Sequence, residues 1–165
     1  MKLENFNNLI ELFFYQAEKQ DPKSILLQWL NPNNKKSFTW EETKLNIFKL
    51  SKTIKENVKE GDRCLLVSEN RPEWFISDLA IMLSGAITVP AYTTYTEEDY
   101  KYLIEDSQPS IIIVSNNEIH NKLKNMIEKK IVSEIFKSIN KILNKKSKGL
   151  HDPLFTGNEK KYLAN

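Results

Sequence analysis

The stretch SENRPEWFISDLAIMLSGAITVP, residues 68–90, decides the fold because it holds a charged turn, a helix and a strand in immediate succession. Pro72 stands in the expected first turn of the helix, where its missing N–H removes no intrahelical hydrogen bond. The only acidic residues of this helix are Glu73 and Asp78, and it is predicted to end at Gly85. Residues 86–90, AITVP, are then predicted to form a buried strand.

The sequence on either side continues the alternation of strands and helices. Residues 63–68, RCLLVS, and 110–116, SIIIVSN, are short apolar runs, which is the pattern of strands covered on both faces. The segment 96–107, TEEDYKYLIEDS, is predicted to be a helix capped by Thr96, with acidic residues in its first turn. This order predicts an α/β fold with a doubly wound, mainly parallel sheet and flanking helices.

The residues before this sheet are predicted to form a helix, a β-hairpin and a second helix. Apolar residues at helical spacing predict the first helix over about residues 6–19. SILLQWL (24–30) and KSFTW (36–40) flank a turn-rich link and predict the hairpin. Thr39 and Glu42 have capping-box spacing at the start of the second helix. We expect its buried face to contain Leu45, Phe48 and Ile54.

Composition places this chain of 165 residues, 40% hydrophobic and 28% charged, among globular proteins with one core. A net charge of +2, from 24 basic and 22 acidic residues, gives no reason to expect a nucleic-acid partner. The single cysteine, Cys64, excludes an internal disulfide and is expected to be a small buried apolar residue. With neither a signal-peptide pattern nor a run that spans a bilayer, we expect a cytoplasmic protein without a transmembrane segment.

The sequence contains no assembled active-site motif. A phosphate-binding loop needs clustered glycines, and the four glycines here are scattered: Gly61, Gly85, Gly149 and Gly157. His120 and His151 have no cysteine or acidic partner at metal-ligand spacing, and His120 is expected at the surface of a polar helix. From the residues alone we therefore predict no catalytic, cofactor-binding or metal-binding residue.

The run from GDRCLLVSENRPEW to IIIVSN, residues 61–116, resembles the N-terminal part of AMP-forming acyl-CoA synthetases. These are long-chain fatty-acid–CoA ligases of the adenylate-forming AMP-dependent synthetase/ligase family. Several features occur in the same order: G-D-R, E-N-R-P-E-W, G-A-I-T-V-P, Y-T-T and an acid-rich helix. Upstream, SFTWEET (37–43) is similar to the family's entry into a helix. The resemblance covers about residues 5–120.

In this family the complete enzyme makes an acyl-adenylate from a fatty acid and Mg-ATP, and then passes the acyl group to CoA. The resemblance implies that the ATP phosphate loop and the catalytic lysine lie beyond the part matched here. The matched residues correspond to a framework subdomain: Glu69, Asn70, Arg71, Pro72, Glu73, Trp74, Gly85 and Pro90. No cofactor is therefore expected in this chain, although ATP, Mg and CoA serve the full-length family.

These framework residues have expected physical roles. Arg71 and Glu73 are spaced to fix the turn before the helix. Trp74 and Phe75 are expected to dock the helix on the sheet. Gly85 and Ala86 are expected to let the helix and the following strand pass closely.

The loop after the strand at residues 86–90 is the expected position of a site. Pro90 is predicted to end the strand, so that Tyr92 and Thr93 follow at the C-terminal edge of the sheet. Ligands of open parallel sheets gather at this edge. Tyr92 and Thr93 are therefore candidates for site-facing positions, with loop packing as the alternative role.

The last part of the chain, about residues 131–165, resembles a different family. LHDPLFTGNEKKYL (150–163) is similar to the N-terminus of DegT-type PLP-dependent sugar aminotransferases, which open with an amphipathic helix. The pyridoxal lysine of that family has no counterpart here, and an ordinary helix with a disordered end is the alternative. We hypothesise a junction between two gene starts near residues 120–131, by deletion or assembly error, which resequencing of the locus tests.

Three segments are therefore predicted: a truncated ligase subdomain over 1–125, a Lys-rich amphipathic helix over 126–148, and an extended or disordered tail over 149–165. The predicted function is a fragment of a fatty-acid–CoA ligase that is inactive alone. The alternatives are a non-enzymatic interaction module, one half of a split enzyme or, from the tail alone, an aminotransferase fragment. An uncovered sheet edge also predicts self-association or aggregation.

Overall fold

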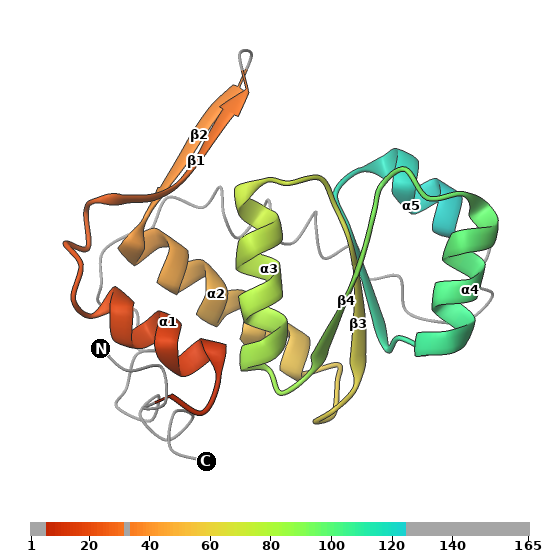
Figure 1. The fold of residues 1–165 in the computed structure, drawn as a ribbon, viewed down its shortest axis with the longest axis horizontal. Coiled ribbons are helices and arrows are strands. Elements are labelled where there is room, and N and C mark those ends of the chain that lie inside the picture. The colour runs from red at the N-terminus through yellow and green to blue at the C-terminus, as the bar shows by residue number, and fades with distance from the viewer. Residues whose placement is uncertain (1–5, 32–33, 125–165) are drawn as a thin grey trace.

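A computed structural model of the chain describes residues 6–31 and 34–124 (Figure 1). The elements are, in order, α1 (Leu9–Ala17), β1 (Ile25–Asn31), β2 (Asn34–Thr39), α2 (Trp40–Lys55), β3 (Arg63–Val67), α3 (Pro72–Leu83), β4 (Ile87–Ala91), α4 (Glu97–Ser107), β5 (Ile111–Val114) and α5 (Asn117–Lys124). This order confirms the predicted α/β class and the hairpin. The helix predicted over 126–148 and the tail over 149–165 lie outside the described residues.

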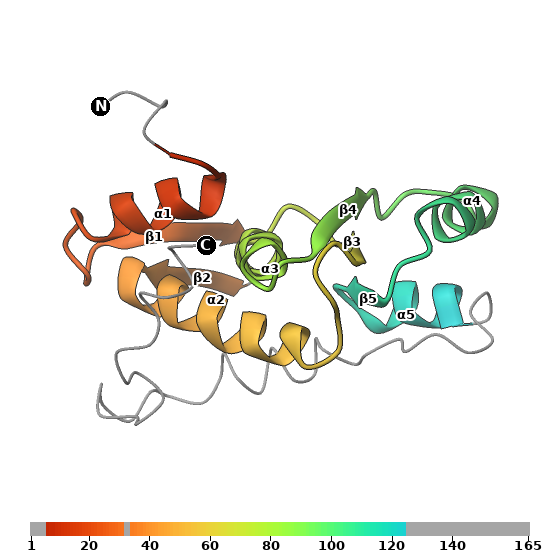
Figure 2. The same cartoon turned by 90° about the horizontal axis from the view of Figure 1, so that it is seen from below.

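The parallel sheet has the strand order β4-β3-β5, so β3 is central. Cys64 of β3 pairs with Thr88 on one side and with Ile111 on the other. Successive side chains of β3 face opposite layers: Leu66 joins the core beneath α1, α2 and α3, and Leu65 joins the core beneath α4 and α5. Figure 2 shows these two groups of helices on opposite sides of the sheet. The prediction that β3 and β5 are covered on both faces is confirmed.

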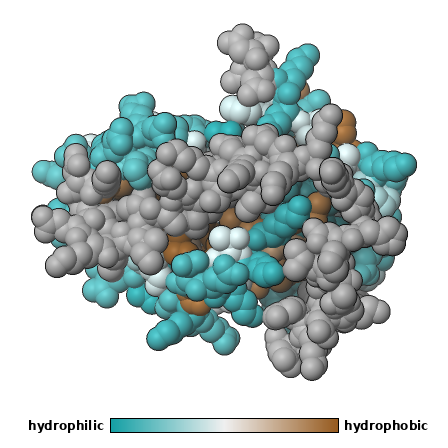
Figure 3. All heavy atoms as spheres, turned by 180° about the vertical axis from the view of Figure 1, so that it is seen from behind, coloured by the Kyte–Doolittle hydropathy of each residue, from teal (hydrophilic) through white to brown (hydrophobic). Residues whose placement is uncertain are grey.

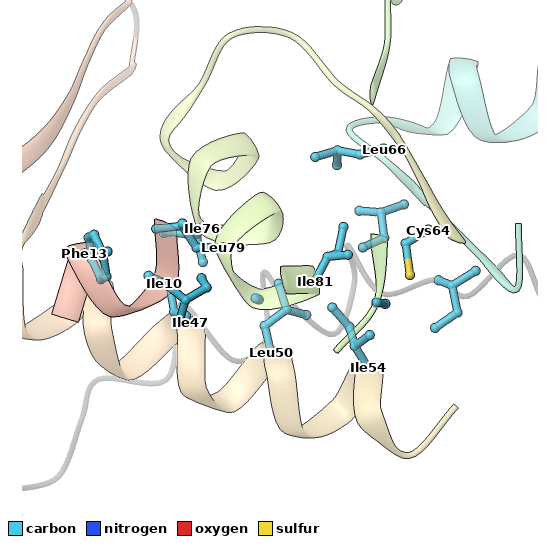
Figure 4. Close-up of a cluster of buried hydrophobic side chains, with 14 of the residues drawn as sticks. Ile10, Phe13, Ile47, Leu50, Ile54, Cys64, Leu66, Ile76, Leu79 and Ile81 are labelled. Atoms are coloured by element: carbon cyan, nitrogen blue, oxygen red, sulfur yellow. The ribbon is translucent and has the colours of Figure 1, made fainter. Parts of the chain in front are cut away.

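The larger core lies where α1, α2 and α3 meet the sheet (Figure 4). Its contribution from α2 consists of three side chains that are at most 2% exposed: Ile47, Leu50 and Ile54. Leu45 and Phe48, which we expected on this face, are only half-buried. Phe48 instead stacks on Phe14 of α1, with 4.9 Å between ring centroids. Ile54 is fully buried as we expected, whereas Ile47 and Leu50 take the central positions of the buried face and Phe48 lies at its margin against α1.

Strand β4 lies at an edge of the sheet and is not the buried strand that we expected from its apolar sequence. Among the described strands it pairs with β3 alone. Ile87 is 52% exposed, and Pro90 is exposed as well. The strand continues to Ala91, so Pro90 lies within it and does not end it. An apolar run alone does not distinguish a central strand from an edge strand.

Gly85 follows α3 with a φ of +86°, in the left-handed region that glycine adopts without strain. Its carbonyl accepts a hydrogen bond from the N–H of Gly61 at 2.9 Å. A Cβ at this position would meet Glu60 Cγ at 3.7 Å, an ordinary contact. The expectation that glycine lets helix and strand pass closely is therefore wrong, and the positive φ of the turn explains the residue.

Candidate functional site

Two loops at the C-terminal edge of the sheet run to opposite faces. Residues 68–71 lead from β3 to α3, and residues 115–116 lead from β5 to α5. Ile76 of α3 belongs to one core, whereas Ile119 of α5 belongs to the other. Because β3 and β5 are neighbours, these residues form the topological switch point at which open parallel sheets bind ligands. We therefore take residues 68–71 and 115–116 as the candidate site and call them the switch point.

The switch point is held together by hydrogen bonds between its two loops. Asn116 Nδ2 donates to Glu69 Oε1 at 3.1 Å, and the N–H of Ser115 donates to the carbonyl of Val67 at 3.0 Å. Asn116 Oδ1 also accepts from the N–H of Ile119 at 2.9 Å, which satisfies a free donor in the first turn of α5. One asparagine side chain therefore orients α5 and joins the two loops. The sequence did not mark Asn116, because its partner Glu69 is remote in the chain.

The E-N-R-P-E-W motif, whose first three residues belong to the switch point, contributes to a buried ion cluster. The side chain of Glu73 is fully buried. Its Oε2 accepts from Arg71 Nε at 2.9 Å, and its Oε1 accepts from Arg71 Nη2 at 3.2 Å and from Lys36 Nζ at 2.5 Å. Burial opposes ionisation, but the hydrogen bonds from Arg71 and Lys36 outweigh it and hold the pKa of Glu73 below its usual range. Arg71 and Glu73, which we expected to fix the turn before the helix, form an ion pair with each other.

The other half of this cluster comes from the β-hairpin, which sequence reasoning missed. Lys36 lies in β2, 37 residues before Glu73. The guanidinium of Arg71 also lies 4.9 Å from the ring centroid of Trp29 in β1, within the range of a cation–π interaction. No local spacing signals such contacts, because the fold itself brings the hairpin to the start of α3.

Trp74 and Phe75 do not form the surface of α3 that faces the sheet. Both are half-buried, whereas Ile76 and Ala80, which share the inner face of the helix, are fully buried. The ring of Phe75 meets that of Phe13 in α1 at 5.9 Å, edge to face. The expectation is corrected in this respect: Phe75 docks α3 on α1.

Tyr92 and Thr93 lie at the same edge of the sheet but after β4, on the far side of β3 from β5. Tyr92 is 71% exposed, and its ring meets the ring of Tyr95 at 5.4 Å. Its carbonyl accepts from the hydroxyl of Tyr100 at 2.7 Å, and the carbonyl of Tyr95 accepts from Lys122 Nζ at 2.6 Å. These contacts pack the loop on α4 and α5. A site-facing role for Tyr92 and Thr93 stays a prediction.

The structure also bears on two further kinds of site, a cysteine nucleophile and a metal centre. Cys64 is fully buried, and burial, with a smaller effect of Asp62, raises the pKa of its thiol to about 11. A thiolate nucleophile is therefore not formed there near neutral pH. Over residues 6–31 and 34–124, no group of His, Cys, Asp and Glu side chains is arranged to hold a metal ion. Within the same ranges, no helix is long and apolar enough to cross a membrane.

The described surface that is visible from behind is mostly hydrophilic, with small apolar areas between the polar side chains (Figure 3). Exposed large apolar side chains are spread over several elements: Leu9 and Tyr15 in α1, Ile25 and Leu30 in the hairpin, Ile87 in β4, Tyr92 just after it, and Tyr102 in α4. Single exposed apolar residues are ordinary in soluble domains. They identify no site beyond the switch point.

Comparison with known proteins gives a family match over most of the chain. The model of the family described as AMP-binding enzyme matches residues 13–160, which includes much of the tail outside the described residues. The long-chain-fatty-acid–CoA ligase FadD15 of Mycobacterium tuberculosis is 30% identical over 107 residues, or 64% of this chain and 18% of the relative. The human mitochondrial acyl-coenzyme A synthetase ACSM5 is 37% identical over 60 residues, or 36% and 10%. The chain thus spans less than a fifth of these relatives.

Solved structures share the fold. VinN in complex with 3-methylaspartate has a TM-score of 0.71 at 15% identity, covering 84% of this chain and 37% of VinN. The fatty acid AMP ligase from Legionella pneumophila has a TM-score of 0.61 at 22% identity, covering 73% of this chain and 22% of the ligase. At these identities the likeness concerns the arrangement of helices and strands.

Proposed function

Because this chain belongs to the AMP-binding enzyme family, we propose that it supplies the N-terminal framework of an AMP-forming fatty-acid–CoA ligase and does not catalyse alone. The observation that carries the proposal is that the charged side chains Arg71 and Glu73 of the E-N-R-P-E-W motif are engaged in structural contacts. Glu73 and Arg71 are engaged with each other and with Lys36, so they join α3 to the hairpin. The motif by which the sequence resembles the ligases therefore builds the scaffold.

The chemistry of the complete reaction supports this assignment. Forming an acyl-adenylate from ATP releases pyrophosphate, and stabilising the charge of the reacting phosphates requires cations or backbone N–H groups aimed at them. The switch point contains Glu69 and Asn116, whose side chains bond each other, and two buried serines, Ser68 and Ser115. Arg71, the cation of this loop, is committed to Glu73. Such a set can hydrogen-bond a polar ligand, but it does not neutralise a triphosphate.

Turnover tests the proposal. The purified 165-residue chain is incubated with Mg-ATP, palmitate and CoA, and pyrophosphate release is followed with a coupled assay. We expect a rate equal to that of the protein-free control, while a complete acyl-CoA ligase in the same buffer is active. Release that requires both the chain and palmitate would overturn the framework role.

A second candidate, a non-enzymatic interaction module, is favoured by the exposure of β4. The N–H of Ile87 donates to the carbonyl of Asp62, on the side of β3. Since backbone groups alternate in direction along a strand, Thr88 and Pro90 present theirs to the outer edge. Pro90 has no N–H, and this weakens the edge as a template for strand addition. A partner would therefore contact side chains such as Ile87, and a defined complex in sedimentation velocity would support this candidate.

A further inference from the structure

The buried ion cluster connects the β-hairpin to the first turn of α3. Trp29 and Lys36 are opposite each other in the hairpin register, so one cross-strand pair reaches the cluster from both strands. Lys36 Nζ contacts Glu73 Oε1 at 2.5 Å, and the ring of Trp29 lies under the guanidinium of Arg71. Residues from β1, β2 and the start of α3 therefore meet in one cluster, with Lys36 and Arg71 at the carboxylate and Trp29 against Arg71.

The two ends of the hairpin are held differently. At its base, Phe38 is 5% exposed within the larger core, and Thr39 caps α2. In the distal half, Gln28, Leu30, Lys35 and Ser37 are exposed. Figure 1 shows this half projecting from the body of the protein. Its attachment therefore depends on Lys36 and Trp29, which contact the cluster.

The two sides of the cluster also differ in freedom. Glu73 stands on a helix that is anchored by Ile76 and Ala80, both fully buried. The side chain of Lys36 is 25% exposed and extends from the hairpin arm. If Glu73 loses its charge, Lys36 and Arg71 remain as two neighbouring cations without a counter-charge, which is costly where water is largely excluded. Outward movement of the hairpin rehydrates Lys36 without disturbing the anchored helix.

We propose that the Glu73 carboxylate is a latch that holds the distal half of the hairpin, residues 28–30 and 35–37, against the first turn of α3. When the carboxylate is neutralised, this half of the hairpin detaches while the parallel sheet stays folded. The latch also constrains the switch point, because Arg71 lies in the same loop as Glu69, the partner of Asn116. The position of the hairpin and the geometry of this loop are therefore coupled.

The direction of the pH response follows from the charges. Within the described part of the chain, the charged groups that face Glu73 are Lys36 from β2 and Arg71 from the preceding turn, and β1 contributes the neutral ring of Trp29. Since the pKa of Glu73 in the folded protein is lowered from 4.5, the latch is fully closed above that value. It opens as the pH falls through the lower pKa of the folded state.

Hydrogen–deuterium exchange of the full chain tests the latch. In Glu73→Gln at neutral pH, we expect hairpin amides to exchange roughly tenfold to a hundredfold faster, as for the loss of a charged hydrogen bond. Amides of β3 and β5 should keep their wild-type protection. Lys36→Met should also accelerate exchange of the hairpin amides, and the protection of these amides should then no longer fall further in acid. Glu105→Gln, which alters an exposed i,i+4 pair with Lys101, is the matched control and should change neither region.

Three results would overturn the latch. The first is unchanged hairpin protection in both Glu73→Gln and Lys36→Met. The second is a uniform loss of protection in hairpin and sheet, which would make the cluster a support of the whole fold. The third is wild-type exchange in acid that accelerates in the sheet and the hairpin together. If Glu73→Gln fails to fold, the acid titration of the wild-type chain and Lys36→Met decide between the same outcomes.

Discussion

The side-chain amide of Asn116 donates to the carboxylate of Glu69 at 3.1 Å and so joins the loops that follow β5 and β3. The two residues lie 47 positions apart in the chain. Their contact marks the place where the connections of two neighbouring strands turn to opposite faces of the sheet. The framework that we propose is thus organised around a polar junction, with its apolar cores on either side.

Replacement of Asn116 should separate its two roles. Asn116→Ala removes both the bond to Glu69 and the cap on α5, and should lower the free energy of unfolding by about 1 kcal/mol. Asn116→Asp keeps a capping oxygen but places a carboxylate beside Glu69. It should therefore recover only part of the stability that Asn116→Ala loses. Asn117→Ala, at the exposed neighbour, is the control. Equal urea midpoints for all four proteins would contradict the junction.

The buried stripe of α2 can be checked by truncation. Leu50→Ala leaves a cavity in the larger core and should cost about 2–5 kcal/mol in urea unfolding. Leu45→Ala, the same change at a half-buried position of the same helix, should cost less than half as much. A larger loss of stability for Leu45→Ala than for Leu50→Ala would mean that Leu45 lies on the buried face of α2, as the sequence predicted.

Sequence reasoning located the elements well, because the signals for them are local. The N-caps at Thr39 and Thr96, Pro72 at the start of α3 and the apolar strand at residues 111–114 each depend on a few adjacent residues. The buried face of α2 and the exposure of β4 are not determined by adjacent residues. They depend on which elements pack beside them, and apolar spacing does not record this.

The candidate site was predictable only in its position at the C-terminal edge of the sheet. That edge follows from parallel strands, but the choice between the loop at Tyr92 and the switch point needs the strand order β4-β3-β5. The spacing of Arg71 and Glu73 in the sequence suggested only that they fix the turn before α3. It did not show Lys36, because a hairpin 37 residues away completes the cluster.

A change at Gly85 should reveal the cost of its backbone conformation. Gly85→Ala meets no close neighbour, so its loss of about 1–2 kcal/mol would arise from the left-handed φ of +86°. Gly85→Asn should lose less, since asparagine tolerates this region better than alanine. Thermal unfolding of the wild type, Gly85→Ala and Gly85→Asn measures their order of stability. Gly85→Ala at wild-type stability would exclude the conformational explanation.

The thiol of Cys64 should be unreactive in the native protein. With its pKa raised to about 11 and its side chain fully buried, we expect negligible labelling by Ellman's reagent at pH 8. Labelling should reach one equivalent in denaturant. Because the pKa of the thiol in the folded protein exceeds its ordinary value of 9.0, the thiol contributes stability below pH 9 that is lost as the pH rises toward 11. Cys64→Ala should lack this alkaline loss, and rapid native labelling would refute the assignment.

Pro90 should limit association through β4. Pro90→Thr restores an outward N–H on the exposed edge strand and should increase self-association in sedimentation velocity at matched concentration. Ile87→Lys places a charge on the same strand and should reduce it. If neither change alters the sedimentation profile, β4 is not the associating edge.

The central claim, a framework that does not catalyse alone, is tested most directly by a single-turnover experiment. The chain is held in excess over Mg-ATP labelled at the α-phosphate, with saturating palmitate and no CoA, so that any acyl-adenylate accumulates. The account predicts no acyl-adenylate above the protein-free control, while a complete ligase forms it under the same conditions. Palmitate-dependent acyl-adenylate formed by this chain would contradict the account.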